Sequence, residues 1–126
     1  MRAFLSLFAL GVAASAGPAD AQTHWVTLGS ATVSVGRDHG IINVISSRSF
    51  RQVRVCVSRN SIRLSTFRVR FHRGGQQRFT INRLLHPGQC TLAYTLHPGP
   101  LRIHNVQLGF AQIQRNAQPT IRLQGR

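Results

Sequence analysis

The chemistry of this 126-residue chain is concentrated in its arginines. The sequence holds sixteen arginines, two aspartates, and no lysine or glutamate, which gives a formal net charge of +14. The planar guanidinium fork binds phosphate, sulfate or carboxylate groups in bidentate fashion. Because the chain supplies so few carboxylates of its own, we expect the counter-ions of these arginines to come from other molecules.

Seven arginines alternate with apolar residues, and a side-chain period of two turns them toward solvent. They are Arg54, Arg63, Arg68, Arg70, Arg78, Arg102 and Arg122. We predict that Arg68, Arg70 and Arg78, with Arg54 nearby, contact an anionic polymer, either envelope phosphate groups such as lipid head groups or an acidic polysaccharide. The alternative is that outward arginines serve solubility alone and reflect the codon usage of a GC-rich genome. We do not expect nucleic acid as the partner, because aromatic residues do not interleave with the arginines and no nucleic-acid motif is present.

The sequence contains few groups that could act in catalysis, and we expect that the protein is not an enzyme. Paired carboxylates are excluded, because Asp38 is the only acid that follows the N-terminal leader described below. We interpret Asp38 as a residue that shapes the turn at 36–40 rather than as a catalytic partner of His39. No Gly-x-Ser-x-Gly motif is present.

The six histidines show no helical i, i+4 spacing and have no carboxylate to orient them, so we expect neither a metal site nor a cofactor. The alternative is that His86, His97 and His104 converge at one end of the fold.

The two cysteines, Cys56 and Cys90, are expected to form a disulfide, because an even count in an oxidising compartment favours one. Such a bridge would close a loop of about 35 residues and would stabilise the fold by roughly 3–4 kcal/mol in the chain-entropy model. Two free thiols are the alternative.

Residues 1–21 have the pattern of a secretory signal peptide. Arg2 is followed by an apolar run over 3–12, and Ala19-Asp20-Ala21 is a cleavage pattern before Gln22, with 14–16 as the alternative site. A buried N-terminal helix is the other interpretation. Cleavage would leave residues 22–126 as a single domain in the periplasm or secreted, with no further apolar run of membrane-spanning length.

The elements that must position these residues are predicted to be strands. Residues 61–81 show the clearest alternation, which slips by two residues at Ser65-Thr66 and so predicts a β-bulge. A second slip falls at His104-Asn105. The pattern repeats with turns every eight to twelve residues, which predicts an all-β, antiparallel sandwich of seven to nine short strands, with a small barrel as the alternative.

The hairpin within 61–81 can be given a register. A three-residue loop at 74–76 would place Phe71 opposite Phe79 and Val69 opposite Ile81, so that apolar side chains share one face. The arginines and His72 would then be neighbours on the wet face.

Several segments together resemble the YaaI-like small exported bacterial proteins of unknown function. They are 25–29, Asp38, 50–57, 62–64, 67–71 with its Gly-Gly turn, 87–91, 102–103 and 106–110. The resemblance covers nearly the whole chain after the leader and implies a secreted all-β domain with no established activity. It supplies no catalytic or ligand residues.

Two functions therefore follow from the sequence. The first is a non-enzymatic domain that binds an anionic polymer through outward arginines. The alternative is a structural or accessory domain that docks on another envelope protein, which would require an exposed apolar patch or an uncovered strand edge.

Overall fold

The computed structural model describes residues 24–112 and 117–126, and all of the regular structure in these ranges is β-strand. The strands are β1 (Val26–Thr32), β2 (His39–Asn43), β3 (Ser49–Phe50), β4 (Gln52–Ser58), β5 (Ile62–Phe71), β6 (Gln76–Leu85), β7 (Tyr94–Thr95), β8 (Leu101–Gln112) and β9 (Thr120–Gly125). The predicted signal peptide, 1–21, lies outside the described residues. Within them, no helix is long and apolar enough to cross a membrane.

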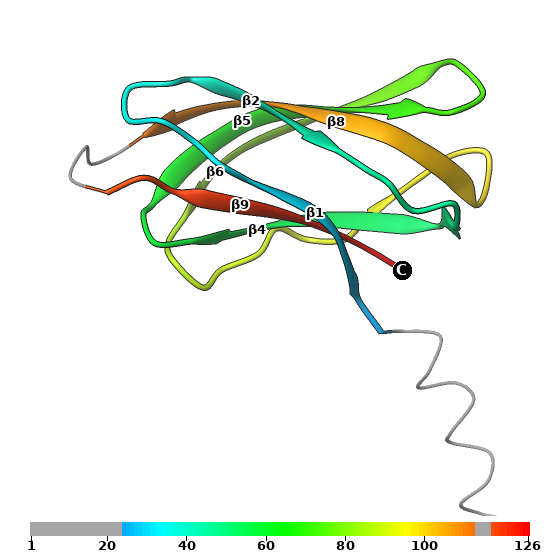
Figure 1. The fold of residues 1–126 in the computed structure, drawn as a ribbon, viewed down its shortest axis with the longest axis horizontal. Coiled ribbons are helices and arrows are strands. Elements are labelled where there is room, and N and C mark those ends of the chain that lie inside the picture. The colour runs from blue at the N-terminus through cyan, green and yellow to red at the C-terminus, as the bar shows by residue number, and fades with distance from the viewer. Residues whose placement is uncertain (1–23, 113–116) are drawn as a thin grey trace, which may run out of the picture.

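The strands form two antiparallel sheets that pack face to face (Figure 1). One sheet has the order β1-β9-β4-β7, and the other has the order β2-β8-β5-β6 with β3 also paired to β8. Neither sheet closes on itself. The predicted antiparallel sandwich is therefore confirmed, and the barrel alternative is wrong.

The core lies between the sheets and is built from the inward side of each strand's alternation. On β4 this side comprises Val53, Val55 and Val57, all fully buried. On β5 the inward residues change parity between Leu64 and Phe67, and the pairing register shifts between Leu64 and Thr66. The bulge predicted from the sequence is confirmed, and its effect is to keep both large side chains inside.

The β5–β6 hairpin has a different register from the predicted one. Phe67 lies opposite Phe79 and Val69 lies opposite Gln77, so the predicted pairs of Phe71 with Phe79 and of Val69 with Ile81 are wrong. The loop has three residues, as predicted, but they are 72–74, because the Phe71 N–H donates to the Gly75 carbonyl at 3.2 Å. Burial of apolar side chains determines which face of the sheet each residue occupies. The turn determines which residues of β5 and β6 lie opposite each other.

Two glycines set this turn. Gly74 and Gly75 both have positive φ angles, of 93° and 85°. This left-handed backbone is accessible to glycine without steric cost. It lets the chain reverse at 72–74, earlier than the loop at 74–76 that the sequence predicted.

The disulfide between Cys56 and Cys90 is formed, with Cα atoms 3.9 Å apart. Around it, residues 88–91 run beside β4 through backbone hydrogen bonds to Val55 and Val57. The bridge spans 34 positions that include β5 and β6. The bridge therefore links the segment that follows β6 to β4 of the opposite sheet.

Removal of this bridge should lower the free energy of unfolding. For the double variant Cys56→Ala/Cys90→Ala we expect a loss of roughly 3–4 kcal/mol, because the unfolded chain regains the entropy of an open loop. Urea unfolding of the variant and the wild type measures the difference. An unchanged unfolding midpoint would contradict this role of the bridge.

The approach of β1 to β2 gives a second test. A Cβ atom at Gly29 would lie 2.7 Å from Ile42 Cγ2 and 2.9 Å from the Asn43 carbonyl oxygen, so Gly29→Ala should cost about 1–3 kcal/mol by overpacking. Gly99→Ala is the matched control, because a Cβ there meets nothing within 4 Å. Equal urea midpoints for the two variants would contradict the close approach.

Candidate anion-binding surfaces

The four arginines predicted to bind an anion are divided between the two outer faces of the sandwich. Arg68 and Arg70 lie on β5 and Arg78 lies on β6, whereas Arg54 lies on β4 of the other sheet. Arg54, Arg68 and Arg70 alternate with side chains of the shared core, and Arg78 precedes Phe79, which packs against that core. Arg54 thus points away from the other three, and the expectation that it lies near them is wrong. Alternation indicates whether a side chain points in or out, but it does not indicate which sheet carries the strand.

The outer face of β5 and β6 brings three of these arginines together. Arg68 is directly opposite Arg78 on one side and Gln107 of β8 on the other, and Arg70 lies two residues along β5. Arg68 Nη1 donates to Gln107 Oε1 at 3.4 Å. The buried Nε of Arg68 has no hydrogen-bond partner among the described residues. We call Arg68, Arg70 and Arg78 the arginine face.

A groove of about 310 Å³ crosses this face. It is lined by His39, Gly40, Ile41, Thr66, Arg68, Arg78, Gln107, Leu108 and Gly109. These residues come from all four strands of the sheet path β2-β8-β5-β6. The groove therefore offers a hollow beside the paired guanidinium groups.

On the opposite face, Arg54 and Arg126 converge on the single tryptophan. Their guanidinium carbons lie 4.4 and 4.3 Å from the centre of the Trp25 ring. Arg54 Nε also donates to Gln124 Oε1 at 2.8 Å. Partial burial, together with the charges of Arg126 and Arg122, lowers the pKa of the Arg54 guanidinium. The indole ring contacts both guanidinium groups, and the Gln124 amide also holds Arg54; neither the ring nor the amide carries a charge.

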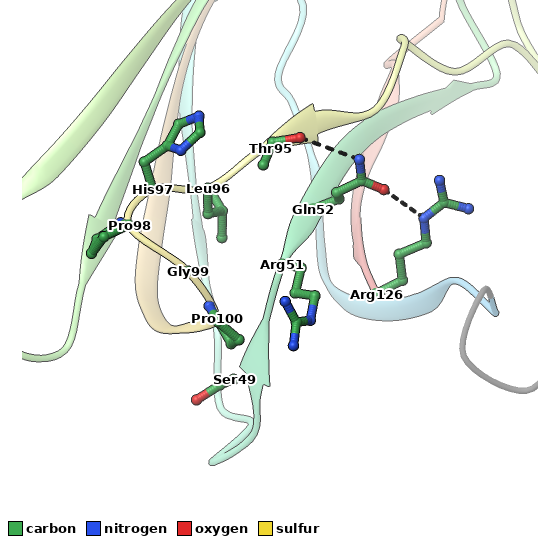
Figure 2. A pocket seen from close by; sticks show the side chains of 10 residues that line it. All are labelled: Ser49, Arg51, Gln52, Thr95, Leu96, His97, Pro98, Gly99, Pro100 and Arg126. Carbon is green, nitrogen blue, oxygen red and sulfur yellow. Dashed lines mark hydrogen bonds between the residues drawn. The ribbon is translucent and has the colours of Figure 1, made fainter. Parts of the chain in front are cut away.

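A further hollow lies at one end of the sandwich, between the start of β4 and the segment 95–100 (Figure 2). We call this cavity of about 890 Å³ the end pocket. Its lining is Ser49, Arg51, Gln52, Thr95, Leu96, His97, Pro98, Gly99, Pro100 and Arg126.

Hydrogen bonds hold the side chain of Arg126 and the backbone of Arg51 at the end pocket. Arg126 Nε donates to Gln52 Oε1 at 2.8 Å, and Gln52 Nε2 donates to Thr95 Oγ1 at 3.3 Å (Figure 2). The backbone of Arg51 donates to the Arg126 carbonyl at 2.8 Å and accepts from Leu96 N–H at 2.8 Å. Sequence reasoning missed this site, because Arg51 falls at the break between β3 and β4, where the alternation gives no signal.

The Asp38–His39 pair does not form an enclosed catalytic site. The two side chains are hydrogen-bonded at 2.9 Å but are 84 % and 66 % exposed, respectively. His39 lines the groove of the arginine face, whereas Asp38 does not. The Asp38 carbonyl accepts a hydrogen bond from Phe110 N–H, which joins the turn before β2 to β8.

The His72 and His104 rings pack edge to face with centres 5.4 Å apart. The described ranges contain no group of three or more His, Cys, Asp or Glu side chains that could hold a metal ion. The alternative in which His86, His97 and His104 converge is therefore wrong.

Comparisons with known proteins add a family and a likeness of fold. A family model described as a domain of unknown function, DUF2541, matches residues 3–125. No curated protein matches the chain. A solved structure of Pseudomonas aeruginosa AlgX is similar in fold, with a TM-score of 0.55 and 12 % identity. The similarity covers 80 % of this chain and 26 % of that one, so this chain spans about a quarter of the AlgX chain. The narrower resemblance to YaaI-like proteins stays a prediction.

The Asp38–His39 contact predicts a measurable titration. The hydrogen bond from His39 lowers the pKa of the Asp38 carboxyl from its ordinary value of 3.8. Any stability that this contact contributes is therefore present above about pH 3.8 and is lost as the pH falls through the lowered value. Carbon-detected NMR titration should place the midpoint below 3.8, and His39→Ala should return it toward 3.8. The same midpoint in both proteins would contradict the contact.

Proposed function

The chain belongs to the DUF2541 family of domains of unknown function, and from its surface chemistry we propose that it is a non-enzymatic module that binds an anionic polymer through the arginine face. The proposed ligand carries carboxylate or phosphate groups at regular intervals, as an acidic polysaccharide or the phosphate groups of an envelope polymer do. The proposed location is the periplasm or the exterior of the cell, which the disulfide supports.

The observation that carries this proposal is the direct opposition of Arg68 and Arg78. Directly opposed residues of an antiparallel pair have Cα atoms roughly 4.5–5.5 Å apart, and like charges at such positions are destabilising. Asp38 is the one carboxylate side chain in the described part of the chain, and it pairs with His39. An anion from another molecule would relieve the repulsion.

The spacing of the arginine face suits a linear ligand. Strands rise about 3.3 Å per residue, so Arg68 and Arg70 are separated by roughly 6.6 Å along β5. A polymer that follows the strand would present successive charged groups to Arg70, to the Arg68–Arg78 pair and to the groove beside them. Apart from Arg78, the residues directly opposite Arg68 and Arg70 are Gln107, Gln76 and Asn105, and no Phe, Tyr or Trp lies among them, which favours a saccharide or phosphate backbone over stacked bases.

Docking on another envelope protein is the second candidate. The strands β2 and β6 are outer strands of their sheet path, and Ile41 and Ile45 are 52 % and 94 % exposed. Isolated apolar side chains on a surface are ordinary, and the charged side chains of Arg78 and Arg83 on β6 discourage pairing with another strand. Polymer binding is therefore the better-supported proposal.

The test compares two triple variants of equal net charge. Arg68→Gln/Arg70→Gln/Arg78→Gln removes the arginine face, and Arg37→Gln/Arg48→Gln/Arg59→Gln removes three exposed arginines outside the strands. We expect the first variant to elute from heparin and polygalacturonate columns at clearly lower salt than the second. Its salt dependence, measured as the slope of log K against log salt, should fall by roughly 0.7–0.9 per lost contact, as it does for nucleic-acid polymers.

The two variants also define the outcome that contradicts the proposal. Equal losses of retention would mean that binding follows total charge and that no particular face is used. Retention of the wild type no stronger than that of an unrelated basic protein would contradict polymer binding altogether.

A further inference from the structure

We propose that the groove across the arginine face is a subsite for one ring of an acidic polysaccharide, meaning a sugar ring that carries a carboxylate. The inference rests on the proposed function, because it concerns the same surface, and it narrows the ligand from any polyanion to an acidic sugar. It is carried by a glycine in the middle of the outer face, by an apolar rim, and by two polar side chains that the structure holds in place.

The groove exists because one position of the outer face has no side chain. Gly109 of β8 lies between His39 of β2 and Thr66 of β5 in the pairing register. Its neighbours Leu108 and Phe110 are buried in the core, so position 109 faces outward. The φ angle of Gly109 is not positive, so its backbone conformation does not require glycine. A glycine inside a strand often marks a place that a ligand approaches closely.

The space above Gly109 is open on the side away from β5. A Cβ atom built there would meet Thr66 Oγ1 at 3.2 Å and no other atom of the described residues within 4 Å, its chain neighbours aside. A ligand in this space would therefore touch the backbone of β8 and the hydroxyl group of Thr66.

The floor and rim of the groove suit the C–H groups of a sugar ring. Gly40 and Leu108 lie opposite each other, and both contribute backbone, because Leu108 is buried and a Cβ at Gly40 would point toward Phe110 at 3.7 Å. The side chain of Ile41, which is 52 % exposed, adds an apolar rim. A phosphate group has no apolar part that could use such a surface, whereas a sugar ring does.

Two polar side chains of the lining are held by neighbours. Arg68 is half-buried, and its Nη1 donates to Gln107 Oε1 at 3.4 Å. The His39 ring is hydrogen-bonded at 2.9 Å to the carboxylate of Asp38, which does not itself line the groove. Arg78 is exposed and adds positive charge opposite Arg68. A ligand carboxylate would pair with the guanidinium groups, and ring hydroxyls would bond the amide of Gln107 and the imidazole of His39.

The size of the groove sets the number of rings. Its volume of about 310 Å³ lies at the lower end of the range of roughly 300–1,000 Å³ that is usual for small-molecule sites. One ring therefore occupies the groove, and adjacent rings of the polymer follow β5 toward Arg70.

The experiment uses trigalacturonate and tripolyphosphate as probes and changes only uncharged side chains. Ile41→Ala removes the apolar rim, and Gly109→Ala places a methyl group in the hollow. In isothermal titration calorimetry we expect Ile41→Ala to weaken trigalacturonate binding about four- to fifteenfold, because one or two methylene groups lose their contact. Gly109→Ala should weaken it at least as much. Both variants should bind tripolyphosphate as the wild type does, because the charge of the arginine face is unchanged.

Ile45→Ala is the matched control. Ile45 is 94 % exposed and does not line the groove, so this variant should bind trigalacturonate as the wild type does. In nitrogen-edited NMR spectra, trigalacturonate should shift the amide signals of His39, Thr66 and Gly109, which locates binding independently of affinity. Urea midpoints identify a variant with a changed fold. Ile41→Ala, at an exposed position, decides the test if Gly109→Ala unfolds.

Failure of this inference can be told apart from failure of the proposed function. The inference alone is overturned if the arginine face still accounts for polymer retention but folded Ile41→Ala binds trigalacturonate as the wild type does. It is also overturned if the variants weaken tripolyphosphate by the same factor, or if trigalacturonate leaves the groove amides unshifted. Both proposals fall if the two triple arginine variants lose retention equally.

Discussion

Burial of the apolar side of every long strand between the two sheets is the constraint on which the rest of this structure depends. It fixes which side chains point inward, and it forces the strands to bulge wherever the sequence changes parity. The bulge between Leu64 and Thr66 is the clearest instance, because without it either Leu64 or Phe67 would face solvent. Because the apolar side chains of the strands face the core, the arginines occupy the outer faces.

The outer faces use amides where many proteins use carboxylates. Gln124 accepts from Arg54, Gln107 accepts from Arg68, and Gln52 accepts from Arg126. An amide oxygen can orient a guanidinium group, but the amide itself carries no charge. The surface thus combines fixed geometry with positive charge on both faces and at one end, an arrangement suited to anionic ligands.

Long-range contacts determine where these cations gather. The bridge from Cys56 to Cys90 and the pairing of β4 with β9 join segments that are distant in the chain. The end pocket exists because Arg126 follows β9 and lies beside Gln52 at the start of β4, 74 positions away. Similarity of fold to part of AlgX shows that this sandwich also occurs within a longer chain, with little sequence in common.

The sequence by itself determined the features that depend on neighbours along the chain. The two-residue period predicted the strands and their inward sides, the slip at Ser65-Thr66 predicted the bulge, and two cysteines after a predicted export signal predicted the disulfide. Only the tertiary structure decided the register of Phe67 against Phe79, the face on which Arg54 lies, and the contact of Arg126 with Gln52 at the start of β4. The physical reason is that alternation fixes the direction of a side chain relative to its own strand, whereas strand order and turn position are set by backbone pairing between distant segments.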